Sequence, residues 1–426
     1  MHSQGSDAFT LTWPCHDTPS PTTPTEYLTS SLPPATSIGI DASLLAISDY
    51  KELAVDLARI GSSLKLLPSN LVDDVWNSIP SGEPGVRPSA PRNEIFIQPL
   101  KYAGKSVAEK VKEVRAEVSK LSATKASEGS QLSGYVATML DEVAWLTNLR
   151  GTDVPYNPVF FSYAIVPLEE KGPAAVYLES SKLTLEAREQ LAEAGVAVKP
   201  YGTFYKDLKA IRGKLGEKER FLIGKRSSLA VADALGGLSN IHADRSPIVD
   251  LKSVKNEVEL EGFRHCHVLD GAALANYFAW LEHELLAGKI IREYEGSEKL
   301  KEFRAQMQGF RGESFTTISS TGPNGAIIHY SPNPEPNQSQ VIDLNHLYLC
   351  DSGAQFVDGT TDVTRTLHFS LSTEDAETLK EIRTAFTKVL QGHIAIDRAV
   401  FPKGTTGYLL DVLARKALWE EGLDYR

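Results

Sequence analysis

The segment LYLCDSGAQFVDGTTDVTRTLHF, residues 347–369, decides how the chain is interpreted. It places three aspartates, a glycine-containing bend and several threonines between two apolar stretches that are typical of β-strands. Asp351 ends the first stretch, Asp362 begins the second, and Asp358-Gly359 between them is a dipeptide that favours tight turns. The pattern predicts a hairpin with a carboxylate at each strand end.

The register of this hairpin decides whether Asp351 and Asp362 meet. A two-residue turn at Asp358-Gly359 would pair Asp362 with Gln355, so the strands must bend or bulge if the two acids are to come together. Two carboxylates that meet in a partly buried sheet repel each other unless one is protonated or a divalent cation lies between them. Oxygen ligands suit hard ions such as Mn²⁺ or Mg²⁺. The alternative is an ordinary hairpin with turn aspartates and β-favouring threonines.

One histidine, His329, is a second candidate for chemistry. It follows a Gly-Pro-Asn-Gly bend in STGPNGAIIHY, residues 320–330, and the apolar residues before it predict that it ends a short strand. An unperturbed imidazole titrates near ~6.5 and can orient a substrate or transfer a proton. The alternative is a histidine satisfied by hydrogen bonds at a strand end.

Composition and charge describe an ordinary globular protein with 42% hydrophobic and 23% charged residues. The net charge of −11 gives no overall basic field for nucleic acid or an anionic membrane. Three cysteines without a CxxC pair predict neither a disulfide framework nor a zinc site. No apolar run is long enough to span a bilayer, and the N-terminus does not resemble a signal peptide. We therefore expect a cytoplasmic protein with no nucleic-acid or membrane partner.

A proline-rich segment, PSGEPGVRPSAPR at residues 80–92, is the clearest linker in the chain. It separates a first α/β domain, residues 1–90, from a second, residues 91–250, in which strands and helices alternate. The third domain, residues 251–426, begins with a long helix at 256–288 and continues with several strands and two further helices. The sequence thus predicts a mixed α/β (α+β) protein.

These motifs resemble those of the aminopeptidase P family, the Xaa-Pro aminopeptidases of the pita-bread metallopeptidase fold. The similar stretches are SSTGPNGAIIHY, DSGAQFVDGTTDVTRT, LDEVAWLTNLRG, NPVFFSYAIV and GFRHCHVLDGAAL, and they look like parts of the long, eukaryotic-type members. The resemblance implies creatinase-type N-terminal α/β domains at residues 1–90 and 91–250. It also implies the N-terminal half of a pita-bread domain at 251–426.

The resemblance further implies that Asp351 and Asp362 are ligands of a pair of Mn²⁺ ions per subunit. His329 matches a histidine that contacts the substrate near the scissile bond and assists proton transfer. The implied reaction is hydrolysis of the bond between an N-terminal residue and a following proline in a peptide substrate. Water between two cations is acidified enough to supply hydroxide, and the metals polarise the carbonyl. Members of this type are often homodimers, which we expect here as well.

The sequence departs from the family pattern toward both ends. It contains no HGxGH motif and no later glutamate strands, and the glycine-rich stretches of the family's first domain are absent. We therefore expect a chain truncated at both ends, with an incomplete ligand set and weakened metal affinity. The alternative function is that of a catalytically inactive homologue acting as a binding or dimerisation module. An apolar face of the last helix is expected to be exposed: Leu409, Leu410, Leu413, Leu418 and Trp419.

Overall fold

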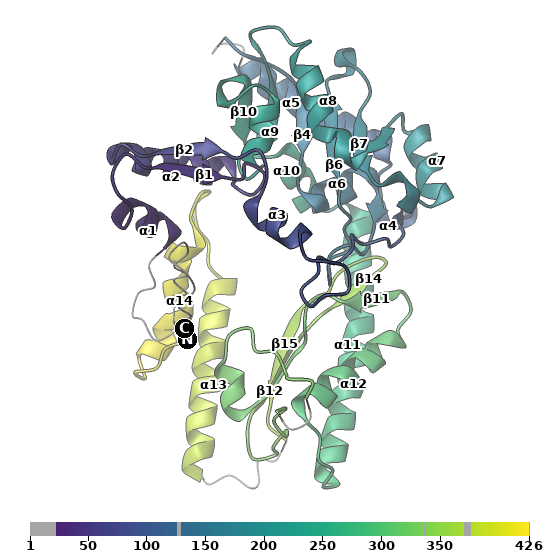
Figure 1. Cartoon of the computed structure of the whole chain (residues 1–426). Coiled ribbons are helices and arrows are strands. Elements are labelled where there is room, and N and C mark those ends of the chain that lie inside the picture. Colours follow the sequence, from purple (N-terminus) through teal and green to yellow (C-terminus); the bar gives the residue numbers. More distant parts are fainter. Residues whose placement is uncertain (1–22, 126–128, 336–337, 370–375, 426) are drawn as a thin grey trace. The chain divides into compact units, whose positions relative to one another are not determined.

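The computed structural model describes residues 23–125, 129–335, 338–369 and 376–425 (Figure 1). The chain divides into two compact units, Met1–Gly262 and Phe263–Arg426, and each is described by itself. The finer division at residues 90 and 250 stays a prediction. Among the described helices, none is both long enough and apolar enough to cross a membrane.

The first unit begins with a small βαβ arrangement. Strands β1 (Ser37–Ile40) and β2 (Ser63–Leu66) are parallel, and α2 (Ile47–Arg59) connects them, as parallel pairing requires. Two short helices precede and follow this βαβ arrangement along the chain, α1 (Pro24–Ser30) and α3 (Leu71–Asn77). Residues 80–92 then form only turns and irregular chain, which agrees with their proline content.

A mixed six-stranded sheet forms the main body of the first unit, with strand order β10-β9-β4-β6-β7-β8. Side chains alternate between two apolar clusters, because neighbouring residues of a strand face opposite sides. Both faces are therefore buried, as in sheets covered by helices on both sides. The strands are β4 (Gln131–Ala137), β6 (Tyr163–Pro167), β7 (Ala175–Leu178), β8 (Ala197–Pro200), β9 (Glu219–Gly224) and β10 (Ile241–Asp244). A separate short pair joins β3 (Phe96–Ile97) and β5 (Leu149–Arg150).

Helices of the first unit present apolar stripes to this sheet. On α5 (Val107–Lys125) the buried apolar residues are valines spaced three and four residues apart, as expected for an amphipathic helix: Val107, Val111, Val114 and Val118. The remaining helices of this body are α4 (Leu100–Ala103), α6 (Leu140–Thr147), α7 (Leu185–Glu193), α8 (Phe204–Arg212), α9 (Leu229–Ala234) and α10 (Pro247–Ser253). The expected α/β organisation of residues 91–250 is present.

The second unit contains a three-stranded antiparallel sheet in the order β12-β13-β15. One face of the sheet packs against the long helix α11 (Glu257–Leu286) and against α12 (Glu293–Ala305). Tyr348 anchors this face, since its hydroxyl lies 2.7 Å from both the Tyr277 hydroxyl and Ser319 Oγ. The strands are β12 (Ile318–Thr321), β13 (Tyr348–Ser352) and β15 (Val363–Leu367), beside a two-stranded pair of β11 (Phe310–Glu313) and β14 (Ala354–Phe356).

Two helices at the end of the described chain, α13 (Ala376–Asp397) and α14 (Gly407–Trp419), pack against each other. The apolar face expected on α14 is only partly exposed. Leu409 and Trp419 are 63% and 49% exposed, whereas Leu418 is 5% exposed. Leu410 and Leu413 are half-buried.

The packing of α13 on α14 depends on Gly392. A Cβ atom added there would lie 2.2 Å from the Ala414 carbonyl oxygen, which is backbone and cannot swing away. Gly392→Ala is therefore expected to lower the free energy of unfolding by about 1–3 kcal/mol. Gly271→Ala on α11, where a Cβ meets no atom within 4 Å, should instead raise it by about 0.5–1 kcal/mol. Urea denaturation measures both, and equal effects at the two glycines would contradict this packing.

Candidate metal centre

The turn of the acidic hairpin lies one residue earlier than its Asp-Gly dipeptide predicts. The Phe356 N–H donates to the Gly359 carbonyl at 2.8 Å, so Val357 and Asp358 form the two-residue loop. The prediction of a turn centred on Asp358-Gly359 is therefore wrong by one residue. That shift moves the pairing by two residues, which places Asp362 opposite Gly353 and away from Gln355.

Contacts with α11 account for the displaced turn. Asp358 Oδ2 lies 2.7 Å from His265 Nδ1, and the Asp358 side chain is buried although the His265 ring is largely exposed. Gly359 lies so close to α11 that an added Cβ would approach Cys266 Sγ at 2.6 Å. Asp358, the middle aspartate of the motif, thus anchors the turn to α11.

The two remaining aspartates lie on one face of the sheet. Asp351 is paired directly with Thr364 across β13 and β15, and paired residues point to the same side. Asp362 precedes Thr364 by two residues, so it shares that side and is the diagonal neighbour of Asp351. Diagonal neighbours have Cα atoms about 7–8 Å apart, within reach of one another through a shared ion. β13 ends before Gly353 and β14 begins after it, and we call this interruption the bend. The pairing register is the same on both sides of it, from Asp351 with Thr364 to Gln355 with Thr360, so the displaced turn and not the expected bulge brings the two acids to one side.

The side chain of Asp351 has an unsatisfied hydrogen-bond acceptor. Its Oδ1 atom is buried and has no hydrogen-bond partner among the described residues. Buried polar oxygens are nearly always paired, so an unpaired carboxylate oxygen indicates a position for a cation or another donor. Asp362 is exposed. Within the described residues, no three His, Cys, Asp or Glu side chains converge on one cation position.

His329 lies in an exposed turn, and the expectation that it ends a strand is wrong. After β12 the chain enters a 3-10 helix, Gly322–Ala326, whose second residue is a proline that cannot donate to a sheet ladder. Ile327 and Ile328 are exposed, and His329 has a left-handed backbone with φ of 55°. The apolar run before the histidine therefore resembles a strand in sequence only. Among the described residues, no hydrogen bond or ion pair joins His329 to Asp351 or Asp362.

A buried carboxylate that the sequence did not single out holds both ends of this turn. Glu293, the first residue of α12, is fully buried. Its Oε1 accepts the Thr321 N–H at 2.7 Å, and both oxygens lie 3.1 Å from Asn324 Nδ2. Its Oε2 accepts the Tyr330 hydroxyl at 2.6 Å. Burial, together with the acceptor Glu293, raises the pKa of Tyr330 above its usual range, so the phenol keeps its proton as a donor.

Glu293→Gln is expected to loosen the His329 turn. The amide replaces one acceptor oxygen by a donor that faces other donors, so the free energy of unfolding should fall by about 1–3 kcal/mol. Limited proteolysis should then cut residues 326–330 faster than in the parent. Glu302→Gln, on the same helix but largely exposed, is the matched control and should change stability by about 0.5 kcal/mol or less. Equal protease resistance of the parent and Glu293→Gln would refute the anchoring role.

Two family models match adjacent parts of the chain. Residues 86–259 match the Creatinase/Prolidase N-terminal domain, and residues 261–426 match Metallopeptidase family M24. The chain is 50% identical over 403 residues to a probable Xaa-Pro aminopeptidase P of Laccaria bicolor, covering 94% of this chain and 58% of that protein. It is 46% identical over 405 residues to one of Penicillium rubens, covering 94% and 62%.

A solved structure agrees with these matches. The X-prolyl aminopeptidase of Caenorhabditis elegans, described as a cytosolic enzyme with a di-nuclear active site, superposes with a TM-score of 0.82 at 31% identity. The aligned part covers 96% of this chain and 63% of that one. The Xaa-Pro dipeptidase of Bacillus anthracis, 18% identical with a TM-score of 0.53, supports the fold alone.

Fold and family models together define a chain of the M24 metallopeptidases, with a creatinase-type N-terminal region and part of a pita-bread domain. Within that class, the chain belongs to the aminopeptidase P family. It spans about three fifths of the length of the curated relatives named above, 58% and 62%.

Proposed function

We propose that the protein is a metal-dependent aminopeptidase that removes the N-terminal residue from peptides with proline in second position. The observation that carries this proposal is the buried, unpaired Oδ1 of Asp351 on the same sheet face as Asp362. The relatives named Xaa-Pro aminopeptidase P supply the substrate class. They give no support to the alternative of an inactive binding module.

Asp351 and Asp362 would hold the cations, and their chemistry fits this role. Carboxylate oxygens are the ligands that hard divalent ions prefer, and a cation would satisfy the unpaired Asp351 oxygen. We propose two Mn²⁺ ions, and the di-nuclear active site described for the C. elegans enzyme supports the number. When bound, such a pair would acidify water and polarise the scissile carbonyl, which a proline amide requires because its nitrogen lacks an N–H.

His329 would contact the substrate and hold or release a proton at a ring nitrogen. Its exposed turn leaves the imidazole accessible, while Glu293 fixes Thr321, Asn324 and Tyr330 around it. A side chain held on such an anchored turn loses less conformational freedom when a peptide binds. We further propose a cytoplasmic location, supported by the description of the C. elegans enzyme as cytosolic, and a homodimer.

Cleavage of an Xaa-Pro-Pro peptide in the presence of Mn²⁺ tests the function. A folded preparation should release the first residue, and a peptide with alanine in second position should remain largely intact. Asp362→Asn should reduce the rate by about 100-fold or more, because even outer-shell partners of metal ligands are worth 10–100-fold. Absence of proline-dependent cleavage by folded, Mn²⁺-loaded protein would contradict the proposal.

A further inference from the structure

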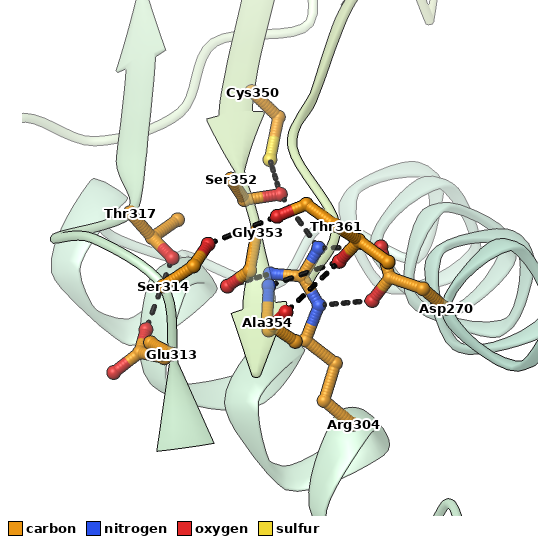
Figure 2. Close-up of polar contacts among 10 residues, drawn as sticks. All are labelled: Asp270, Arg304, Glu313, Ser314, Thr317, Cys350, Ser352, Gly353, Ala354 and Thr361. Atoms are coloured by element: carbon orange, nitrogen blue, oxygen red, sulfur yellow. Dashed lines mark hydrogen bonds and ion pairs between the residues drawn. The ribbon is translucent and has the colours of Figure 1, made fainter. Parts of the chain in front are cut away.

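A buried ion pair lies against the bend of the acidic hairpin (Figure 2). Arg304 on α12 and Asp270 on α11 are 0% and 2% exposed. The Arg304 Nε atom is 2.7 Å from Asp270 Oδ1, and Nη2 is 3.1 Å from Oδ2, so the planar guanidinium donates to both carboxylate oxygens. This geometry fixes the orientation of the guanidinium and leaves further N–H groups facing the sheet.

Those N–H groups reach the two residues that follow Asp351. Nη2 of Arg304 also donates to Ser352 Oγ at 3.1 Å, and Nη1 donates to the Gly353 carbonyl at a longer 3.4 Å. Figure 2 shows the guanidinium between the Asp270 carboxylate and the strand at Ser352 and Gly353. Arg304 therefore holds the backbone on one side of the bend.

Hydrogen bonds of Ser314 extend this support to the other side. The Ser314 N–H donates to the Gly353 carbonyl at 3.0 Å, and the Ser314 hydroxyl donates to the Thr361 carbonyl at 3.0 Å. That carbonyl belongs to the peptide bond that joins Thr361 to Asp362. A continuous set of hydrogen bonds thus leads from Arg304 to the residues adjoining both candidate ligands (Figure 2).

Stability alone gives little reason for this arrangement. Removing a guanidinium and a carboxylate from water costs several kcal/mol per ion, and apolar residues of similar volume are often as stable as a buried ion pair. What apolar residues cannot supply is donors for Ser352 Oγ and the Gly353 carbonyl. The contribution specific to Arg304 is therefore to the geometry of the bend.

We propose that Arg304, oriented by Asp270, is a positioning residue that holds Asp351 and Asp362 in the arrangement a shared divalent cation requires, an inference that rests on the proposed function. Arg304 touches neither the cation nor the substrate in this role. It acts through Ser352 and Gly353.

The test is a double variant, Arg304→Met with Asp270→Leu, which removes the buried charges without leaving one unpaired. The control is Lys182→Met with Asp153→Leu, which removes another buried ion pair, whose Nζ–Oδ2 distance is 2.6 Å, in the first unit. Mn²⁺ affinity is measured from the electron paramagnetic resonance signal of the free ion. Amide hydrogen exchange of Ser314 and Thr361 is measured on metal-free protein.

We expect the Arg304/Asp270 variant to bind Mn²⁺ about tenfold more weakly or worse, as for other residues that orient metal ligands. Its Ser314 and Thr361 amides should exchange about tenfold faster, since local opening becomes easier. The Lys182/Asp153 control should match the parent in Mn²⁺ affinity and in the exchange rates of these two amides. Arg304→Lys is the second variant, because one ammonium cannot reproduce the two parallel hydrogen bonds of the guanidinium. We expect weaker Mn²⁺ binding and faster amide exchange here too, but with smaller changes than in the double variant.

Mn²⁺ affinity within about twofold of the parent in either folded variant would overturn the inference, given the usual effect of such residues. Unchanged exchange at both amides would overturn it as well. Because exchange is measured without metal, its outcome is independent of whether the parent cleaves Xaa-Pro peptides, so failure of the proposed function can be told apart from failure of the positioning role.

Discussion

Asp351→Asn should weaken Mn²⁺ binding by about 100-fold or more while leaving the fold as stable as before. The affinity falls because the substitution removes the charge that offsets cation dehydration, and outer-shell residues alone are worth 10–100-fold. Stability should hold because the Asp351 Oδ1 has no hydrogen-bond partner to lose among the described residues. The metal-free protein should unfold within about 0.5 kcal/mol of the parent.

Isothermal titration with Mn²⁺ and urea denaturation measure the two effects separately. Asp397→Asn, which neutralises an exposed carboxylate at the end of α13, is the control for general loss of negative charge. If affinity fell equally in the control, or if Asp351→Asn kept the full Mn²⁺ affinity, Asp351 would not be a metal ligand. A large loss of stability would instead assign the residue a structural role.

Gly353→Ala is expected to lower the free energy of unfolding by about 3 kcal/mol, the upper range for overpacking. A Cβ atom there would lie 2.2 Å from both Ser314 Oγ and the Thr361 carbonyl oxygen. Those atoms belong to the hydrogen bond that joins the two sides of the bend, so the substitution pushes the strands apart where Asp351 and Asp362 must converge. Mn²⁺ affinity should fall with stability.

Gly325→Ala provides the matched glycine control in the same unit. A Cβ at Gly325 would meet its nearest neighbour, Leu349, at an ordinary 3.6 Å, so stability should change by about 0.5 kcal/mol or less. Urea denaturation followed by Mn²⁺ titration of both variants distinguishes a tight bend from a general need for glycine. If Gly353→Ala proved as stable as Gly325→Ala, the bend would not be sterically closed.

Local patterns predicted the regular elements well. The valine spacing of α5 marks its buried stripe, and the apolar stretches around the acidic motif mark β13 and β15. These elements are predictable because burial of one face imposes a period of 3.6 or 2 on the sequence itself. The mixed α/β fold class follows from the order in which these periods alternate along the chain.

The turn and the histidine segment were mispredicted because distant contacts determine them. Asp-Gly favours the centre of a two-residue turn, but the contact of Asp358 with His265 and the approach of Gly359 to Cys266 move the turn by one residue. The apolar residues before His329 resemble a strand, yet Glu293 draws Asn324 and Tyr330 into a turn. Neither contact leaves a local sequence signal.

The charged residues that shape the site were not predictable from the helix that carries them. Helix α12, EYEGSEKLKEFRA, is rich in charge, and its buried stripe contains one large apolar residue, Leu300. Glu293 and Arg304 lie at helical spacing from Leu300, seven residues before it and four after it, but a stripe with so few apolar residues is a weak signal of burial. Charged residues are rarely fully buried, so a sequence reading assigns them to the surface. Only the tertiary structure shows that Glu293 contacts the turn that carries His329 and that Arg304 contacts the bend at Gly353.

The two faces of strand β13 lie in different surroundings. Tyr348 and Cys350 point into the core, and Asp351 points to the candidate site. A strand's faces exchange when its register slips by one residue. A one-residue insertion or deletion in β13 would therefore carry the carboxylate into the core and turn the tyrosine outward. Such a change would disrupt both the core and the proposed cation site in a single step, so length variation among descendants of this chain should spare β13 and fall in the connections around it.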